Sequence, residues 1–132
     1  MKIVVDTNIL VSAIFFDGLP EKLIDLILSG AVTIVLSEDM LQEYKSTIRK
    51  MFGKLTKSGL RFSLAPLLEY SVKVKPKSKI KICRDSDDDK FIVCAVDGDC
   101  EYIITGDNDL LSLDSYKNVN IVTVRDFLKM FA

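Results

Sequence analysis

The chain of 132 residues contains no histidine, no tryptophan and only three cysteines. The lack of histidine excludes Ser-His-Asp and Cys-His nucleophilic catalysis, histidine acid–base catalysis and the usual zinc ligands. Any hydrolytic chemistry must then rest on carboxylates, whose oxygens suit hard cations such as Mg²⁺ and Mn²⁺. The cysteines, Cys83, Cys94 and Cys100, are odd in number and lack CxxC spacing. We interpret them as small buried hydrophobic residues rather than as a disulfide framework or a zinc site.

Long apolar runs are also missing. No run approaches the roughly 20 residues that a membrane helix needs, and the opening apolar stretch is interrupted too soon, at Asp6, to be a signal peptide. Hydrophobic residues make up 48% of the chain and charged residues 28%, as in a globular protein. We therefore expect one domain over residues 1–132, a cytoplasmic location and no membrane partner.

Charge is segregated along the chain, although the net charge is only −1. Residues 45–84 contain twelve Lys and Arg against the single acid Glu69, and residues 85–114 contain ten Asp and Glu against the single base Lys90. A basic flank beside an acidic pocket is the layout expected of a metal-dependent enzyme that acts on a polyanion. The alternative is two exposed faces of opposite charge that bind no ligand.

The most unusual stretch is residues 85–89, where four aspartates open an apolar run over residues 91–96. On a helix, Asp85, Asp88 and Asp89 share one face, and their repulsion raises at least one pKa unless a cation or water relieves it. These acids either form a solvated helix N-terminus, where they suit the helix dipole, or contribute to a metal site.

Short β-branched runs alternate with helical stripes along the chain, which predicts an α/β fold with a parallel sheet. The predicted strands lie near residues 2–5, 32–36, 70–74, 101–104 and 120–122. The predicted helices lie near residues 9–16, 21–29, 38–52, 53–70 (one helix or a pair), 87–96, 110–113 and 127–131.

Acidic side chains follow two of the predicted strands: Asp6 follows the first and Asp107 the fourth. In open parallel sheets, functional groups gather beyond the carboxyl ends of the strands. Glu43 and Asp89 lie on helices that begin after strand ends, so they can reach the same edge. Four carboxylates at one edge predict a site for Mg²⁺ or Mn²⁺.

The chain resembles PIN-domain proteins, and among them the VapC-type toxins of toxin–antitoxin systems. Four motifs carry the resemblance in the expected order: Val-Asp-Thr-Asn at 5–8, Glu43, Asp-Ser-Asp-Asp-Asp at 85–89 and Thr-Gly-Asp-Asn-Asp at 105–109. The resemblance implies a three-layer, Rossmann-like α/β/α sandwich with five parallel strands in the order 3-2-1-4-5. It also implies a Mg²⁺- or Mn²⁺-dependent endoribonuclease with an RNA substrate, a small antitoxin partner and a homodimeric state.

The resemblance also implies site residues. Catalytic and metal-binding roles fall on Asp6, Glu43, Asp89 and Asp107. Asp89 is preferred to Asp88 because it leads directly into the following helix, and Asp89→Asn is then expected to leave metal-free stability unchanged or raised. Accessory roles, such as orienting the carboxylates, fall on Thr7, Asn8, Asp85, Asp88, Thr105 and Asp109. Residues expected to hold flanking phosphates are Arg49, Lys50, Lys54 and Arg84.

A divalent cation on these carboxylates would activate a water for attack on the phosphodiester, so no covalent nucleophile is needed. The 2′-OH of RNA need not take part, so this chemistry alone does not exclude DNA. Two alternatives stay open: a PIN-like module that binds RNA or a partner without cutting it, and an aspartyl-nucleophile phosphatase using Asp6. The phosphatase usually has a second acid two residues on, where this chain has Asn8.

Overall fold

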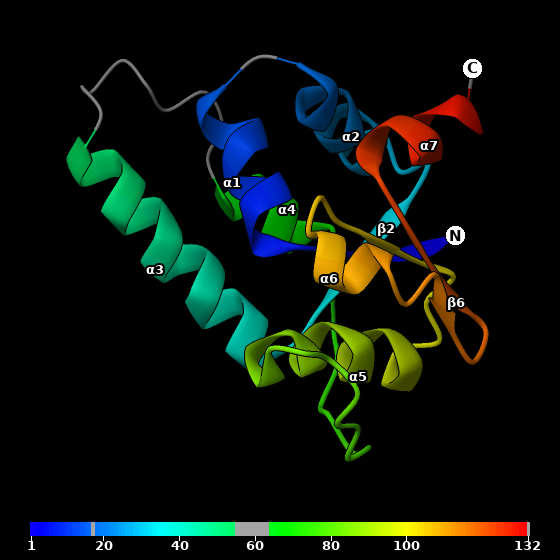
Figure 1. The fold of residues 1–132 in the computed structure, drawn as a ribbon. Coiled ribbons are helices and arrows are strands. Elements are labelled where there is room, and N and C mark those ends of the chain that lie inside the picture. Colours follow the sequence, from blue (N-terminus) through cyan, green and yellow to red (C-terminus); the bar gives the residue numbers. More distant parts are fainter. Residues whose placement is uncertain (17, 55–63, 132) are drawn as a thin grey trace.

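A six-stranded sheet lies at the centre of the computed structural model, which describes residues 1–16, 18–54 and 64–131 (Figure 1). Within these residues the strand order is β3-β2-β1-β4-β6-β5, and all neighbours are parallel except β5 and β6. The strands are β1 (Lys2–Val5), β2 (Thr33–Leu36), β3 (Val72–Lys73), β4 (Tyr102–Ile104), β5 (Ser115–Tyr116) and β6 (Val119–Val122).

Helices cover the sheet on both sides. Helix α5 packs against β1, β2 and β4 on one side, and α2 and α7 lie together on the other (Figure 1). This arrangement gives three layers. The helical elements are α1 (Thr7–Phe15), α2 (Leu19–Leu28), α3 (Glu38–Lys54), α4 (Leu64–Glu69), the 3₁₀ turn η2 (Ser86–Asp88), α5 (Asp89–Asp97), α6 (Asn108–Leu111) and α7 (Val124–Lys129).

Strand β1 is the buried centre of the fold. Ile3, Val4 and Val5 have no exposed surface, as is typical of a parallel strand covered on both faces. The strand pairs with β2 on one side and β4 on the other. Its carboxyl end therefore delivers the next residue, Asp6, to the middle of one edge of the sheet.

The prediction of a purely parallel, five-stranded sheet is wrong. The parallel strands do follow the predicted order, but β5 adds a sixth, antiparallel strand beside β6. The two strands form a hairpin whose turn, Lys117-Asn118, lacks the Asn-Gly or Asp-Gly pair that identifies such turns in a sequence. Lys117 adopts a positive φ of 51° that only the folded backbone reveals.

The helical predictions hold for most of the chain, with two differences. The acidic run begins as η2, so α5 itself starts at Asp89. The helix predicted over residues 53–70 is described as α4 in its last part, and residues 55–63 lie outside the described residues. Cys94 and Cys100 are buried free thiols, in line with their interpretation as small hydrophobic residues. Among the described residues, no helix is both long and apolar enough to cross a membrane.

Gly98 ends α5 in close contact with the sheet. A Cβ at this position would lie 2.8 Å from Val35 Cγ1 and 2.9 Å from the Cys94 carbonyl oxygen. Because these atoms belong to the buried core, we expect Gly98→Ala to lower the free energy of unfolding by about 1–3 kcal/mol in urea titrations. Gly106→Ala is the control, since its Cβ would lie 3.8 Å from the nearest atom, Ile9 Cδ1. Equal losses in the two variants would contradict this packing.

Candidate active site

An acidic pocket lies at the carboxyl edge of the sheet, with a volume of about 150 Å³. Its lining comes from the β1–α1 junction, α3, the η2–α5 segment and the β4–α6 loop. The lining residues are Asp6, Thr7, Asn8, Glu43, Thr47, Asp88, Phe91 and Asp107. Three of the four predicted metal-binding acids therefore meet in this acidic pocket, and the fourth acid that lines it is Asp88 rather than Asp89.

Asp6 is the most buried acid of the pocket, with 7% of its surface exposed. One carboxylate oxygen accepts the Asn8 backbone N–H (3.2 Å) and the other accepts the Thr105 hydroxyl (2.5 Å). Burial raises the pKa of Asp6, and the nearby charges of Asp107 and Glu43 add to this rise, while the two hydrogen bonds oppose it; the net shift is upward. The ionised form of Asp6 is therefore disfavoured mainly by burial, and the neighbouring acids add to this effect.

Thr105 links the two acids that follow strands. While its hydroxyl donates to Asp6, it also accepts the backbone N–H of Asp107 (3.0 Å). Asp107 in turn caps α6, since its carboxylate accepts the Asp109 N–H (2.8 Å). These contacts fix the β4–α6 loop against the end of β1, so the carboxylates of Asp6 and Asp107 face the same pocket.

Tyr44 places Glu43 beside Asp6. The Tyr44 ring is fully buried, and its hydroxyl donates to the Val5 carbonyl at the end of β1 (2.5 Å). This bond holds the second turn of α3 against the carboxyl edge of the sheet. The sequence analysis assigned the Tyr44 hydroxyl no role, although a buried tyrosine needs a hydrogen-bond partner.

Lys90 supplies a positive charge at the pocket. Its ammonium group lies 2.9 Å from a Glu43 carboxylate oxygen and donates to the Asp87 carbonyl (2.6 Å). The other Glu43 oxygen accepts the Thr7 hydroxyl. Sequence reasoning assigned Lys90 no role, although it is the only base in the acidic stretch. Thr47, one turn after Glu43 on α3, and Phe91 on α5 line the pocket, and sequence reasoning assigned neither of them to the site.

The structure does not bring Asp89 into the acidic pocket. The Asp89 carboxylate instead accepts the backbone N–H groups of Cys83 (2.8 Å) and Ile82 (3.2 Å). Burial raises the pKa of Asp89, but the hydrogen bonds from these two residues outweigh it, so the net shift is downward. This side chain ties the start of α5 to the segment before η2.

Asp88, one residue earlier, faces the pocket. Burial, followed by the charges of Asp107, Asp85 and Asp6, raises its pKa from 3.8 to about 6, against the opposing effect of Lys90. The crowding of acids in residues 85–89 predicts that at least one pKa is raised, as that of Asp88 is. Part of the rise comes from Asp107 and Asp6, which are distant in the sequence.

The remaining predicted residues are absent from the lining of the pocket as far as the described residues show. Asp85 caps η2 by accepting the Asp87 N–H (3.0 Å). Asp109 lies 3.9 Å from Arg84. Arg49 and Lys50 are exposed on α3, and the side chain of Lys54 lies outside the described residues.

The donor chemistry of the pocket suits a hard divalent cation, because all four acids offer carboxylate oxygens and two of them have raised pKa values. As arranged, however, no three His, Cys, Asp or Glu side chains within residues 1–16, 18–54 and 64–131 are grouped closely enough to hold a metal ion. The Glu43 carboxylate is held by Lys90 and Thr7 instead. The candidate ligands for such a cation are the four acids that line the pocket: Asp6, Glu43, Asp88 and Asp107.

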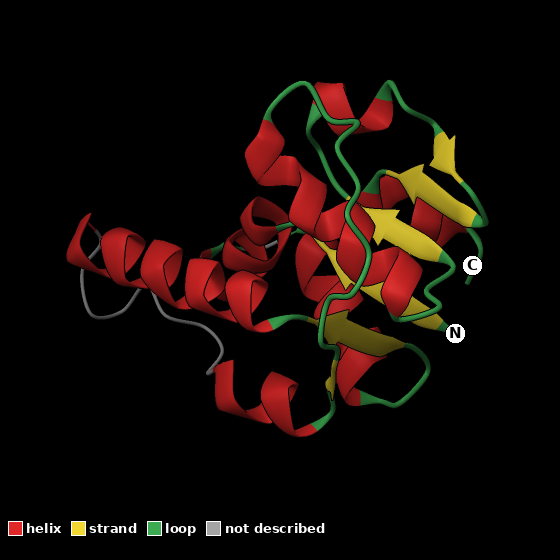
Figure 2. Cartoon of the chain, turned by 90° about the horizontal axis from the view of Figure 1, so that it is seen from below, coloured by secondary structure: helices red, strands yellow, loops and turns green. Residues whose placement is uncertain are grey.

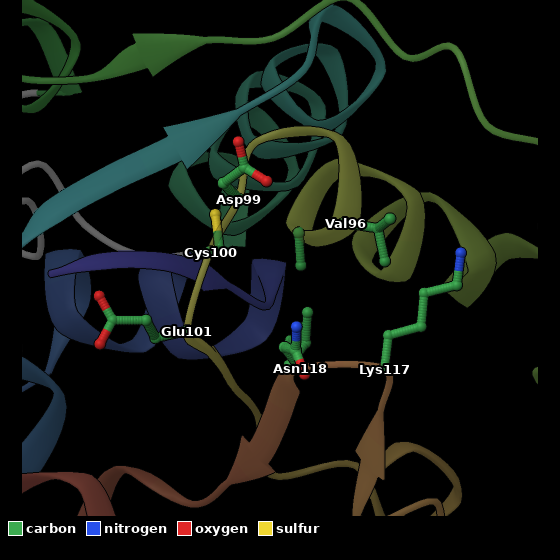
Figure 3. A pocket seen from close by; sticks show the side chains of 8 residues that line it. Val96, Asp99, Cys100, Glu101, Lys117 and Asn118 are labelled. Carbon is green, nitrogen blue, oxygen red and sulfur yellow. The ribbon is translucent and has the colours of Figure 1, made fainter.

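Another cavity, of about 380 Å³, opens between the end of α5 and the β5–β6 hairpin (Figure 3). Val96 lines it from α5, Glu101 from just before β4, and Lys117 from the hairpin. These residues lie near the amino ends of β4 and β6, whereas the acidic pocket lies at the carboxyl ends. None of the predicted site residues lines this cavity.

Asp88→Asn is expected to raise the melting temperature at pH 7.5 in EDTA. The pKa of Asp88 rises on folding from 3.8 to about 6, so its ionised carboxylate opposes folding above pH 6. Below about pH 4 it is protonated in the folded state, and the difference from wild type should vanish. Asp99→Asn, an exposed acid outside the pocket, is the control. A melting temperature unchanged at pH 7.5 would contradict the crowding of acids.

Asp89→Asn is expected to lower stability in the same buffer by about 1–3 kcal/mol, because it weakens two hydrogen bonds to a charged acceptor. The pKa of Asp89 is lowered on folding, so this stabilisation should be present at neutral pH and fade as the solution is acidified through that pKa. Thermal unfolding at pH 7.5 and pH 3 measures both. An unchanged or raised melting temperature would restore the expectation drawn from the sequence.

Comparison with known proteins agrees with this fold. Residues 2–109 match the family model described as "PIN domain". The "Uncharacterized protein MJ1680" of Methanocaldococcus jannaschii is 32% identical over 145 aligned positions, which cover 99% of this chain and 92% of that protein. No solved structure matches the chain. The chain therefore belongs to the PIN-domain family.

Proposed function

We propose that this protein is a Mg²⁺- or Mn²⁺-dependent endoribonuclease. PIN domains are generally nucleases, and the chain matches that family over most of its length. The observation that carries the proposal is the convergence of four carboxylates in one pocket: Asp6, Glu43, Asp88 and Asp107. Asp88 takes the role that the sequence assigned to Asp89, because only Asp88 lines the pocket.

Some residues of the pocket would hold the cation, and others fix the orientation of the carboxylates. Asp6, Glu43, Asp88 and Asp107 would hold the divalent cation. When bound, such a cation supplies the Lewis acid that activates water and offsets negative charge on the phosphate. Thr105 and the Asn8 backbone keep the Asp6 carboxylate in one orientation, as ligand-supporting hydrogen bonds do at other metal sites.

Lys90 balances the charge of Glu43. Its ammonium lies 2.9 Å from the Glu43 carboxylate, and it also lowers the pKa of Asp88. In the proposed enzyme, Glu43 would help to hold the cation, and the Lys90 ammonium would carry a positive charge suited to a phosphate.

The residue two positions after Asp6 disfavours an aspartyl-nucleophile phosphatase. That class of enzyme usually has a second acid there, whereas this chain has Asn8. A PIN-like module that binds without cutting is the stronger alternative. All four acids are present, which favours an enzyme, and a cleavage assay separates these two functions.

The toxin role, the small antitoxin partner and the homodimer extend the proposal beyond the pocket. They rest on the resemblance of the motifs at residues 5–8, 85–89 and 105–109 to VapC-type toxins. A small DNA-binding protein encoded beside this gene would support the toxin role. Growth arrest on expression of the wild type, but not of Asp6→Asn, would support it independently.

Labelled single-stranded RNA should be cleaved in Mn²⁺ and left intact in EDTA. Asp6→Asn and Asp88→Asn should each lower the rate at least about 100-fold, because residues that merely orient metal ligands already cost 10–100-fold. Asp99→Asn is the matched control, since it changes the same charge at an exposed position away from the pocket. RNA that is bound but not cut by the wild type in Mn²⁺ would contradict the nuclease and favour the binding module.

A further inference from the structure

Residues 73–83, here called the lysine strap, connect β3 to the segment before η2 (Figure 2). Lysines occupy every second position from its start: Lys73, Lys75, Lys77, Lys79 and Lys81. All five are exposed, whereas Val74 and Ser78 are partly buried and Ile80 is buried; Pro76 and Ile82 are exposed as well. Through Val74, Ser78 and Ile80 the chain faces the protein, and its lysines face solvent, as expected of an extended segment.

Two aspartates at the ends of α5 hold the lysine strap. Asp97 accepts the backbone N–H groups of Lys77 (2.6 Å) and Ser78 (2.8 Å) and the Ser78 hydroxyl (2.5 Å). Asp89 accepts the N–H groups of Ile82 and Cys83 at the other end. The lysine strap therefore runs antiparallel to α5.

The spacing of these anchors keeps the lysine strap stretched. From Asp89 to Asp97 the helix rises about 12 Å, and extended chain from Ser78 to Ile82 spans about 13 Å. The chain between the anchors thus has little slack. Its lysines are presented in a fixed row, so binding a ligand along that row orders little additional backbone.

Three lysines of the lysine strap are available to bind a ligand, and the lysine strap leads toward the acidic pocket. Lys73 pairs with Glu38 (2.6 Å), whereas Lys75, Lys77 and Lys79 form no ion pair with any residue in the described part of the chain. Arg84 follows the lysine strap directly and lies 3.9 Å from Asp109, whose N–H binds Asp107 in the pocket.

We propose that the lysine strap binds the phosphate backbone of single-stranded RNA and guides it to the acidic pocket. Alternate residues of an extended chain lie about 6.7 Å apart, which is comparable to the separation of successive phosphates in an extended strand. A basic track that follows one backbone is typical of sites for single strands. The inference takes its substrate from the proposed nuclease function, but its test measures binding alone.

The test measures the affinity of the wild-type chain for a fluorescent single-stranded 12-mer RNA in EDTA, by anisotropy over a series of salt concentrations. The strap variant combines Lys75→Gln, Lys77→Gln and Lys79→Gln. The control combines Lys22→Gln, Lys117→Gln and Lys129→Gln, three exposed lysines with the same total charge. The strap variant should bind about tenfold or more weakly at low salt, and its salt slope should be about 2 smaller, near 0.7 for each lost phosphate contact.

The variant Asp97→Asn tests whether RNA binding depends on the fixed position of the lysines or only on net charge. The substitution removes a negative charge, so attraction to a polyanion would become stronger if only net charge mattered. Release of the Lys77 and Ser78 anchors should instead weaken binding severalfold while every lysine remains. Thermal unfolding checks that the variant is folded at the assay temperature, and if it is not, Ser78→Ala replaces it as the milder loss of anchoring.

Two results would overturn the proposal: equal affinities and salt slopes for the strap and control variants, or tighter binding by Asp97→Asn. If the strap and control variants bind RNA equally but differ in their affinity for an acidic peptide, the lysine strap would be assigned to a protein partner instead. Failure of RNA cleavage in Mn²⁺, with strap-dependent binding intact, would contradict the nuclease function but leave the binding track standing.

Discussion

The burial and crowding of carboxylates at the carboxyl edge of the sheet is the constraint on which this site depends. Burial first, and then the charges of neighbouring acids, raises the pKa values of Asp6 and Asp88. The fold tolerates these charges through Thr105, which binds Asp6, and Lys90, which pairs with Glu43. A divalent cation that bound only the folded state would stabilise this arrangement further.

The sequence allowed correct prediction of the features that depend on local pattern. Asp6 and Asp107 follow buried strands, so the rule that parallel strands share an edge was enough to bring them together. The sequence did not reveal that Asp88 rather than Asp89 lines the pocket, because the 3₁₀ turn η2 precedes α5. The hairpin of β5 was missed because its turn depends on a lysine with positive φ. No local pattern reveals the Tyr44 bond to Val5, which joins distant segments.

Asp89 has a structural role in the folded chain. It stands with Asp97 at the two ends of α5, and both carboxylates hold the preceding segment rather than a cation. The acidic run thus serves two purposes from adjacent positions, with Asp88 toward the pocket and Asp89 toward the lysine strap. The lysine strap, which carries five of the lysines of the basic segment, is held directly against α5 by the carboxylates of Asp89 and Asp97.

Direct titration of Mn²⁺, followed by electron paramagnetic resonance of the free ion, tests the central claim that the acidic pocket binds a cation. The account predicts that Asp88→Asn weakens Mn²⁺ binding by about tenfold or more, whereas folded Asp89→Asn binds within a few-fold of wild type. Loss of binding in Asp89→Asn with full binding in Asp88→Asn, or a wild type that binds no Mn²⁺ at millimolar concentration, would contradict it.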